Sequence, residues 1–120
     1  MSDTIGYITP QVERILGLSS IKDRNIYIGF SNIQHMISSH PNDYQKYGNK
    51  ISDILSSPDY IGLNPKDNSL EYVKEYRIDN EYVKVAIRVS NSGKYYARSL
   101  YILNNNRVNN FIAAGTLKKI

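Results

Sequence analysis

Two histidines, His35 and His40, are the side chains best suited to proton transfer, and they lie in the segment HMISSHP at 35–41. On a helix that turns about 100° per residue, His40 falls on the same side as the apolar residues at positions 33, 36 and 37, whereas His35 points nearly opposite. We therefore expect His40 to face a sheet at the C-terminal end of its helix, where the helix dipole favours an imidazolium, and His35 to face solvent. An imidazole can take the proton of a ribose 2′-hydroxyl and return one to the leaving 5′-oxygen. The alternative is that each histidine is structural or merely exposed.

A metal site at these histidines has less support from the sequence. His35 and His40 are five residues apart rather than four, so they do not share a helical face, and the only other ligand nearby is Asp43. Cysteine is absent, which excludes a Cys-ligated zinc and thiolate chemistry. We expect no bound metal and no other cofactor.

A second group of candidate residues carries cations and hydroxyls on two predicted strands. Lys84 and Arg88 lie on the first strand, and Arg98, Ser99 and Tyr101 lie on the second. Arginine stabilises the charge of a phosphorane-like transition state, and the hydroxyls can donate hydrogen bonds to phosphate oxygens. Arg98 and Ser99 point to opposite faces of an ideal strand, so both serve one site only if a bulge intervenes or one acts from the strand edge. The alternative is a solvated cationic face.

The charge of the chain is strongly asymmetric. The formal net charge is +4, and no Asp or Glu occurs after Glu81. The basic residues beyond that point are Lys84, Arg88, Lys94, Arg98, Arg107, Lys118 and Lys119. A positive region of this kind favours a phosphate-bearing partner, most simply RNA, although a solvated basic face would have the same composition.

Length and motifs exclude several classes of protein. The 120 residues suit one domain spanning 1–120, without repeats or linkers. No apolar run approaches the roughly 20 residues that cross a bilayer, and residues 1–20 lack the pattern of a signal peptide, so we expect no membrane association. GxGxxG, Walker, GxSxG and HExxH motifs are missing, which argues against nucleotide-binding enzymes, serine hydrolases and zinc proteases.

The hydrophobic pattern changes from helical spacing to alternation along the chain. We predict an α+β fold in which N-terminal helices pack on a small antiparallel sheet of about four strands. The predicted helices are Pro10–Leu16 closed by Gly17, a helix capped by Ser31 or Asn32 and ending at Pro41, 42–55, and 106–114 closed by Gly115. The predicted strands are 25–30, 70–78, 82–89 and 95–103, with a hairpin turn at 91–93.

The order of these segments resembles the phage-associated branch of the barnase, EndoU, colicin and RelE-like (BECR) nucleases. The resemblance runs from about Ile5 to Phe111 and includes GYITP, NIYI and the His-x4-His-Pro spacing. Its most specific stretches are IQHMISSHP at 33–41, ILSSPDYI at 54–61 and RSLYILN at 98–104.

The resemblance implies a metal-independent endoribonuclease with a BECR or barnase-like fold. It makes His40 the first candidate acid/base and His35 the second, and it places Lys84, Arg88, Arg98 and Ser99 on the strands that hold the remaining groups. Such domains commonly form toxin tips of larger exported proteins that act in the bacterial cytoplasm, often on tRNA, and that an immunity protein neutralises. The alternatives are a non-catalytic RNA-binding or structural phage domain and a protein-interaction module.

Overall fold

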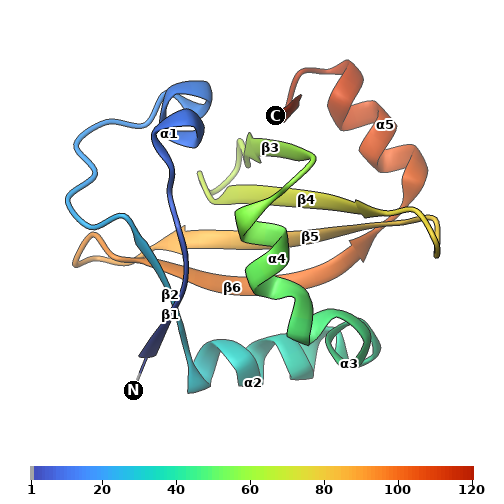
Figure 1. Ribbon diagram of the computed structural model, residues 1–120, viewed down its shortest axis with the longest axis horizontal. Coiled ribbons are helices and arrows are strands. Elements are labelled where there is room, and N and C mark those ends of the chain that lie inside the picture. The colour runs from blue at the N-terminus through green and yellow to red at the C-terminus, as the bar shows by residue number, and fades with distance from the viewer. Residues whose placement is uncertain (1) are drawn as a thin grey trace.

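The computed structural model describes residues 2–120 and contains one β-sheet with helices on both of its faces (Figure 1). No helix among these residues is long and apolar enough to cross a membrane. In chain order the elements are β1 (Ser2–Tyr7), α1 (Pro10–Leu16), β2 (Asn25–Gly29), α2 (Phe30–Ser39), α3 (Pro41–Tyr47), the short 3-10 helix η1 (Gly48–Lys50), α4 (Ile51–Ser56), β3 (Tyr60–Leu63), β4 (Leu70–Tyr76), β5 (Glu81–Val89), β6 (Tyr95–Leu103), α5 (Asn105–Ala113) and β7 (Leu117–Lys119).

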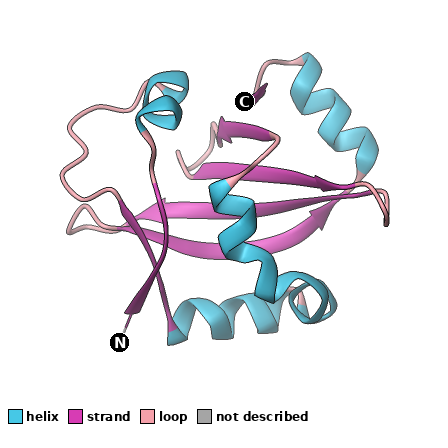
Figure 2. Cartoon of the chain, viewed as in Figure 1, coloured by secondary structure: helices cyan, strands magenta, loops and turns pink. Residues whose placement is uncertain are grey.

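The sheet has seven strands in the order β1-β2-β6-β5-β4-β3-β7. Figure 2 shows the strands of the sheet and the helices around it in two colours. All neighbours are antiparallel except β2 and β6, which run parallel and pair only through Ile26 with Tyr95 and Tyr27 with Tyr96. The predicted fold of about four antiparallel strands is therefore wrong, because the sheet is larger and mixed. The description of the fold as N-terminal helices on a sheet was also incomplete, although the helix predicted at 106–114 is present as α5.

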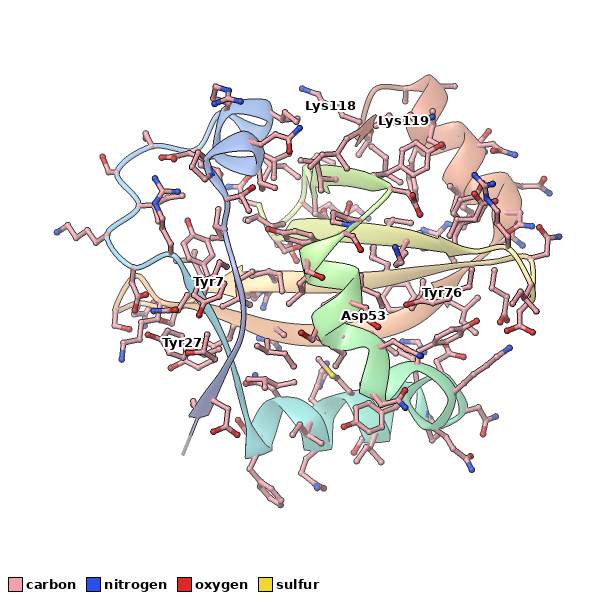
Figure 3. All side chains as sticks on the ribbon, in the orientation of Figure 1. Tyr7, Tyr27, Asp53, Tyr76, Lys118 and Lys119 are labelled. Carbon is pink, nitrogen blue, oxygen red and sulfur yellow. The ribbon has the colours of Figure 1, made fainter. Side chains whose placement is uncertain are left out.

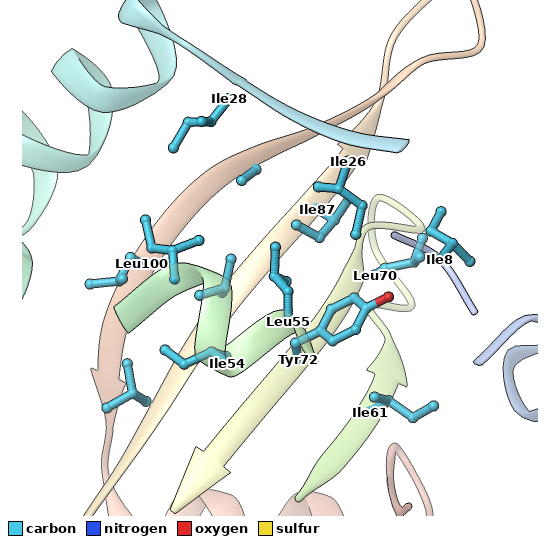
Figure 4. Packing of buried hydrophobic residues seen from close by; sticks show 14 of the residues in the cluster. Ile8, Ile26, Ile28, Ile54, Leu55, Ile61, Leu70, Tyr72, Ile87 and Leu100 are labelled. Carbon is cyan, nitrogen blue, oxygen red and sulfur yellow. The ribbon is translucent and has the colours of Figure 1, made fainter. Parts of the chain in front are cut away.

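The main hydrophobic core lies between one face of the sheet and α4 (Figure 4). Ile54 and Leu55 of α4 are buried together with Tyr72, Ile87 and Leu100 of the central strands. The alternation in β5 produces this arrangement, because every second side chain of a strand points to the same face. Burial of these side chains fixes the register of β4, β5 and β6.

The opposite face of the sheet is only partly covered. Val108 of α5 is buried against Val73, Leu103 and Leu117 at one end of this face. The rest of that face carries polar side chains, among them Glu71, Lys84, Ser99 and Arg88, and we call it the open face, although Glu71 and Lys84 themselves are buried.

Helices α2 and α3 lie along β6 where β2 no longer pairs with it. A carboxylate oxygen of Asp43 in α3 accepts a hydrogen bond of 3.0 Å from the backbone N–H of Ile102. This bond satisfies a donor on the edge of β6 and fixes the start of α3 beside the strand. The corner between α2 and α3, which contains His40, is thereby held at the sheet.

Two local predictions about these helices were wrong. The predicted helix 42–55 is interrupted, with α3 ending at Tyr47 and α4 beginning at Ile51. Helix α2 begins at Phe30 rather than after a Ser31 or Asn32 cap, and Asn32 instead accepts a hydrogen bond from the Gly29 N–H. Asn32 thus reaches back from the third helical position, which satisfies one free donor at the helix start.

Candidate active site

His40 lies at the corner between α2 and α3 and stacks on Tyr101 of β6. The two ring centroids are 4.8 Å apart and the planes are inclined by 27°. His40 is half-buried, as its helix phase predicts, whereas His35 is exposed on the other side of α2. Proline at the next position starts α3 at once, so His40 adjoins the C-terminus of one helix and the N-terminus of another. The prediction from the sequence included only the first of these two helix ends.

Lys84 packs with its ammonium group over the ring of Tyr101. Its Nζ lies 4.7 Å from the centre of the Tyr101 ring and 2.6 Å from Oε2 of Glu71. The Lys84 and Glu71 side chains are only 8% and 7% exposed. Burial by itself lowers the pKa of Lys84, but the hydrogen bond to Glu71 and the contact with Tyr101 outweigh it, so the pKa is raised overall. Lys84 therefore stays charged and makes a cation–π contact with Tyr101.

A β-bulge in β6 brings Arg98 and Ser99 to the same face. Ala86 pairs with Ser99, whereas the next residue, Ile87, pairs with Ala97, so Arg98 is an extra residue without a partner on β5. Both side chains then line one hollow with Arg88, instead of pointing to opposite faces. From the sequence, Arg98 and Ser99 could share a site only if a bulge intervened or one of them acted from the strand edge, and the structure contains such a bulge.

Arg88 lies on β5 opposite Tyr96, farther from His40 than Lys84 does. Its Nη2 lies 2.9 Å from Oδ2 of Asp67, in the loop between β3 and β4. The hollow beside the pair has a volume of about 60 Å³, and a second one of about 160 Å³ shares Arg88 and Arg98 with it. Arg98 is exposed and makes no ion pair with any residue from 2 to 120. The open face thus offers one unpaired arginine beside a paired one.

Six of the seven candidate residues belong to this region, and His35 does not. Along the open face the order is His40 and Tyr101, then Lys84, then Ser99, and finally Arg98 and Arg88. Within residues 2–120 no three His, Asp or Glu side chains are grouped as metal ligands would be.

Glu71 and Asp67 are acidic members of the region that the sequence prediction missed. Glu71 could have been found, because alternation places it opposite the core residues Leu70 and Tyr72 and therefore on the same face as Lys84. Asp67 lies in a loop, where no periodic pattern indicates the direction of a side chain.

The basic C-terminal third does not form a single surface. Lys118 and Lys119 lie on β7 beside α5, on the opposite side of the view from α2 (Figure 3). Lys84 and Arg88 are paired with Glu71 and Asp67, which come from earlier in the chain. The absence of acidic residues after Glu81 therefore overstates the positive charge of the open face.

A comparison with protein families identifies the chain. The model of the family described as phage-Barnase-EndoU-ColicinE5/D-RelE like nuclease 3 matches residues 3–110. The chain belongs to this nuclease family. Searches of the curated proteins and of the solved structures found no match. The matched part of this nuclease domain includes the whole region from His40 to Tyr101 and excludes Lys118 and Lys119 on β7.

Proposed function

We propose that this nuclease domain is a metal-independent endoribonuclease in which His40 carries the proton. The observation that supports the proposal most directly is the stacking of His40 on Tyr101, at the border of a face that carries cations and hydroxyls. The ring holds the imidazole at the sheet while the histidine remains half-exposed, so a substrate can reach it.

In the proposed reaction the 2′-oxygen of a ribose forms a bond to the adjacent phosphorus, and the bond from phosphorus to the 5′-oxygen breaks. His40 takes the proton of the 2′-hydroxyl, and the imidazolium returns a proton to the leaving 5′-oxygen. Arg98, which is unpaired, faces the negative charge that develops on the phosphate, and Ser99 and Tyr101 donate hydrogen bonds to its oxygens. Lys84 does not contact the substrate, because it is buried and paired with Glu71; its charge acts on the reaction through Tyr101.

This chemistry has a direct test. Purified protein is incubated with total RNA in excess EDTA, and with a DNA strand of the same sequence as one cleaved RNA. The proposal predicts cleavage of RNA only, with products that end in a 2′,3′-cyclic phosphate and a 5′-hydroxyl. Intact RNA at high protein concentration contradicts the proposal, and salt-dependent binding without cleavage supports a non-catalytic RNA-binding domain.

The biological setting is also a proposal and is supported by the resemblance of the sequence to toxin nucleases. We place the activity in the bacterial cytoplasm, with tRNA as the first substrate to examine and with an immunity protein as the partner. Expression of the domain in bacteria should stop growth, and sequencing of the cut RNA ends should identify the substrate. Normal growth with soluble, wild-type protein present contradicts a toxin function.

A further inference from the structure

The hollow beside Arg88 has the donors of an anion-binding site, and the carboxylate of Asp67 occupies part of it. Asp67 places one carboxylate oxygen 2.9 Å from Nη2 of Arg88. The other oxygen accepts hydrogen bonds from the backbone N–H and the hydroxyl of Ser69, at 3.0 and 2.7 Å. Ser99 and Arg98 complete the lining. Two guanidinium groups, two hydroxyls and an N–H are a donor set that suits a phosphate.

The carboxylate is fixed by its own loop rather than by the arginine. The hydrogen bonds from the Ser69 N–H and hydroxyl, with the Arg88 contact added, lower the pKa of Asp67 to about 2, so it is ionised at neutral pH. Ser69 is buried and therefore keeps these donors in place. Asp67 would thus keep its position if Arg88 turned away.

Arg88 can exchange partners, because the pair is open to solvent. The Arg88 and Asp67 side chains are 42% and 37% exposed, and ion pairs of this kind contribute little to stability. A phosphate in the hollow could bind Arg98, which has no ion pair among residues 2–120. Its attraction to Arg88 is weaker, because the Asp67 carboxylate stays next to that guanidinium.

We propose that Asp67 competes with a phosphate of the bound nucleic acid for Arg88 and so weakens a second phosphate site next to the reaction centre. The inference rests on the proposed function, since it takes single-stranded RNA as the ligand. Arg98 and Ser99, which contact the scissile phosphate in the proposed reaction, border this site. Arg88 pairs with Tyr96 and therefore lies farther along the hairpin from His40 and Tyr101 than Ser99 does. A neighbouring phosphodiester of the same strand is the group that would reach it.

The experiment measures binding separately from cleavage. A fluorescent RNA strand with 2′-O-methyl groups lacks the attacking hydroxyl, and its binding is followed by anisotropy between 50 and 200 mM salt. Each added phosphate contact steepens the plot of log K against log salt by about 0.7 for a single strand. Asp67→Asn should therefore bind more tightly than wild type, with an advantage that shrinks about 2.6-fold across this fourfold salt range.

Asp79→Asn is the matched control, because it makes the same charge change in the turn at the opposite end of β5. It should leave the slope unchanged. Arg88→Gln should reduce binding strongly in the Asp67→Asn background and only slightly in the wild type, which is the coupling expected of direct competitors. Asp67→Ser keeps an oxygen for the Ser69 N–H and replaces Asp67→Asn if the latter does not fold.

Three results overturn the inference. An unchanged slope for Asp67→Asn shows that Asp67 does not compete, even if the wild type cleaves ordinary RNA. An equal change in Asp79→Asn shows that net charge alone is responsible. If neither the wild type nor Asp67→Asn binds the strand at 50 mM salt, the inference fails, and separate cleavage of ordinary RNA then decides whether the proposed function fails with it.

Discussion

Removal of one partner of the buried Glu71–Lys84 ion pair should destabilise the protein far more than removal of both. Glu71→Leu leaves a buried cation without a counter-charge, and Lys84→Met leaves a buried carboxylate. The side chains are 7% and 8% exposed, so water cannot replace the lost partner. Each single variant should therefore lose about 3–5 kcal/mol of unfolding free energy.

The double variant Glu71→Leu, Lys84→Met should be within about 1 kcal/mol of wild type or more stable, because well-packed apolar side chains avoid the desolvation of two charges. Urea unfolding followed by circular dichroism at pH 7 gives the four free energies of the cycle. A domain of this size is typically stable by about 5–15 kcal/mol, so the single variants are expected to unfold at much lower urea concentrations. Losses below about 1 kcal/mol that simply add would refute the burial of this pair.

The same double variant separates the structural part of Lys84 from its part in the reaction. It keeps the fold and removes the charge beneath Tyr101. Its RNA cleavage should fall by roughly tenfold or more, which corresponds to about 1.4 kcal/mol of lost transition-state stabilisation. A wild-type rate would mean that Lys84 serves only the fold.

Three further predictions concern other parts of the molecule. Gly62→Ala should cost about 1–3 kcal/mol and lower the melting temperature, because the new Cβ would lie 2.2 Å from the carbonyl oxygen of Thr116. The pKa of Asp67 is lowered to about 2, so the stability that its ionised form adds is complete above about pH 4 and is lost as the pH falls toward 2. The unfolding free energy of Asp67→Asn, measured over this pH range, should therefore fall less steeply than that of the wild type. Asp43→Ala should cost about 2 kcal/mol in urea unfolding by freeing the Ile102 N–H, and Asp43→Asn, which keeps an acceptor, should cost less.

The parts of the fold with strong local signals could be predicted from the sequence. Helix α1 is bounded by Pro10 and Gly17, and Gly17 adopts the left-handed conformation expected of a C-cap. The hairpin of β5 and β6 follows from alternation, and the half-buried position of His40 follows from the helix phase. Each of these features depends on residues that are close together in the chain.

The missed features depend on pairing between distant segments. β3 and β7 have four and three residues, too few for alternation to be recognised, and β1 has an exposed, polar start. The parallel pairing of β2 with β6 involves two residue pairs and has no local signal. The bulge at Arg98 could be named only as a condition for a shared site, because a strand pattern does not show where an extra residue lies.

The role of His40 is tested most directly by a comparison of RNA cleavage rates in EDTA for the wild type, His40→Ala and His35→Ala. We predict that His40→Ala loses about 10²–10⁴-fold in rate, the usual contribution of a positioned acid and base, while its circular dichroism is unchanged. His35→Ala, which removes an exposed imidazole from the other side of α2, should cleave as the wild type does. Full activity in His40→Ala would contradict the account.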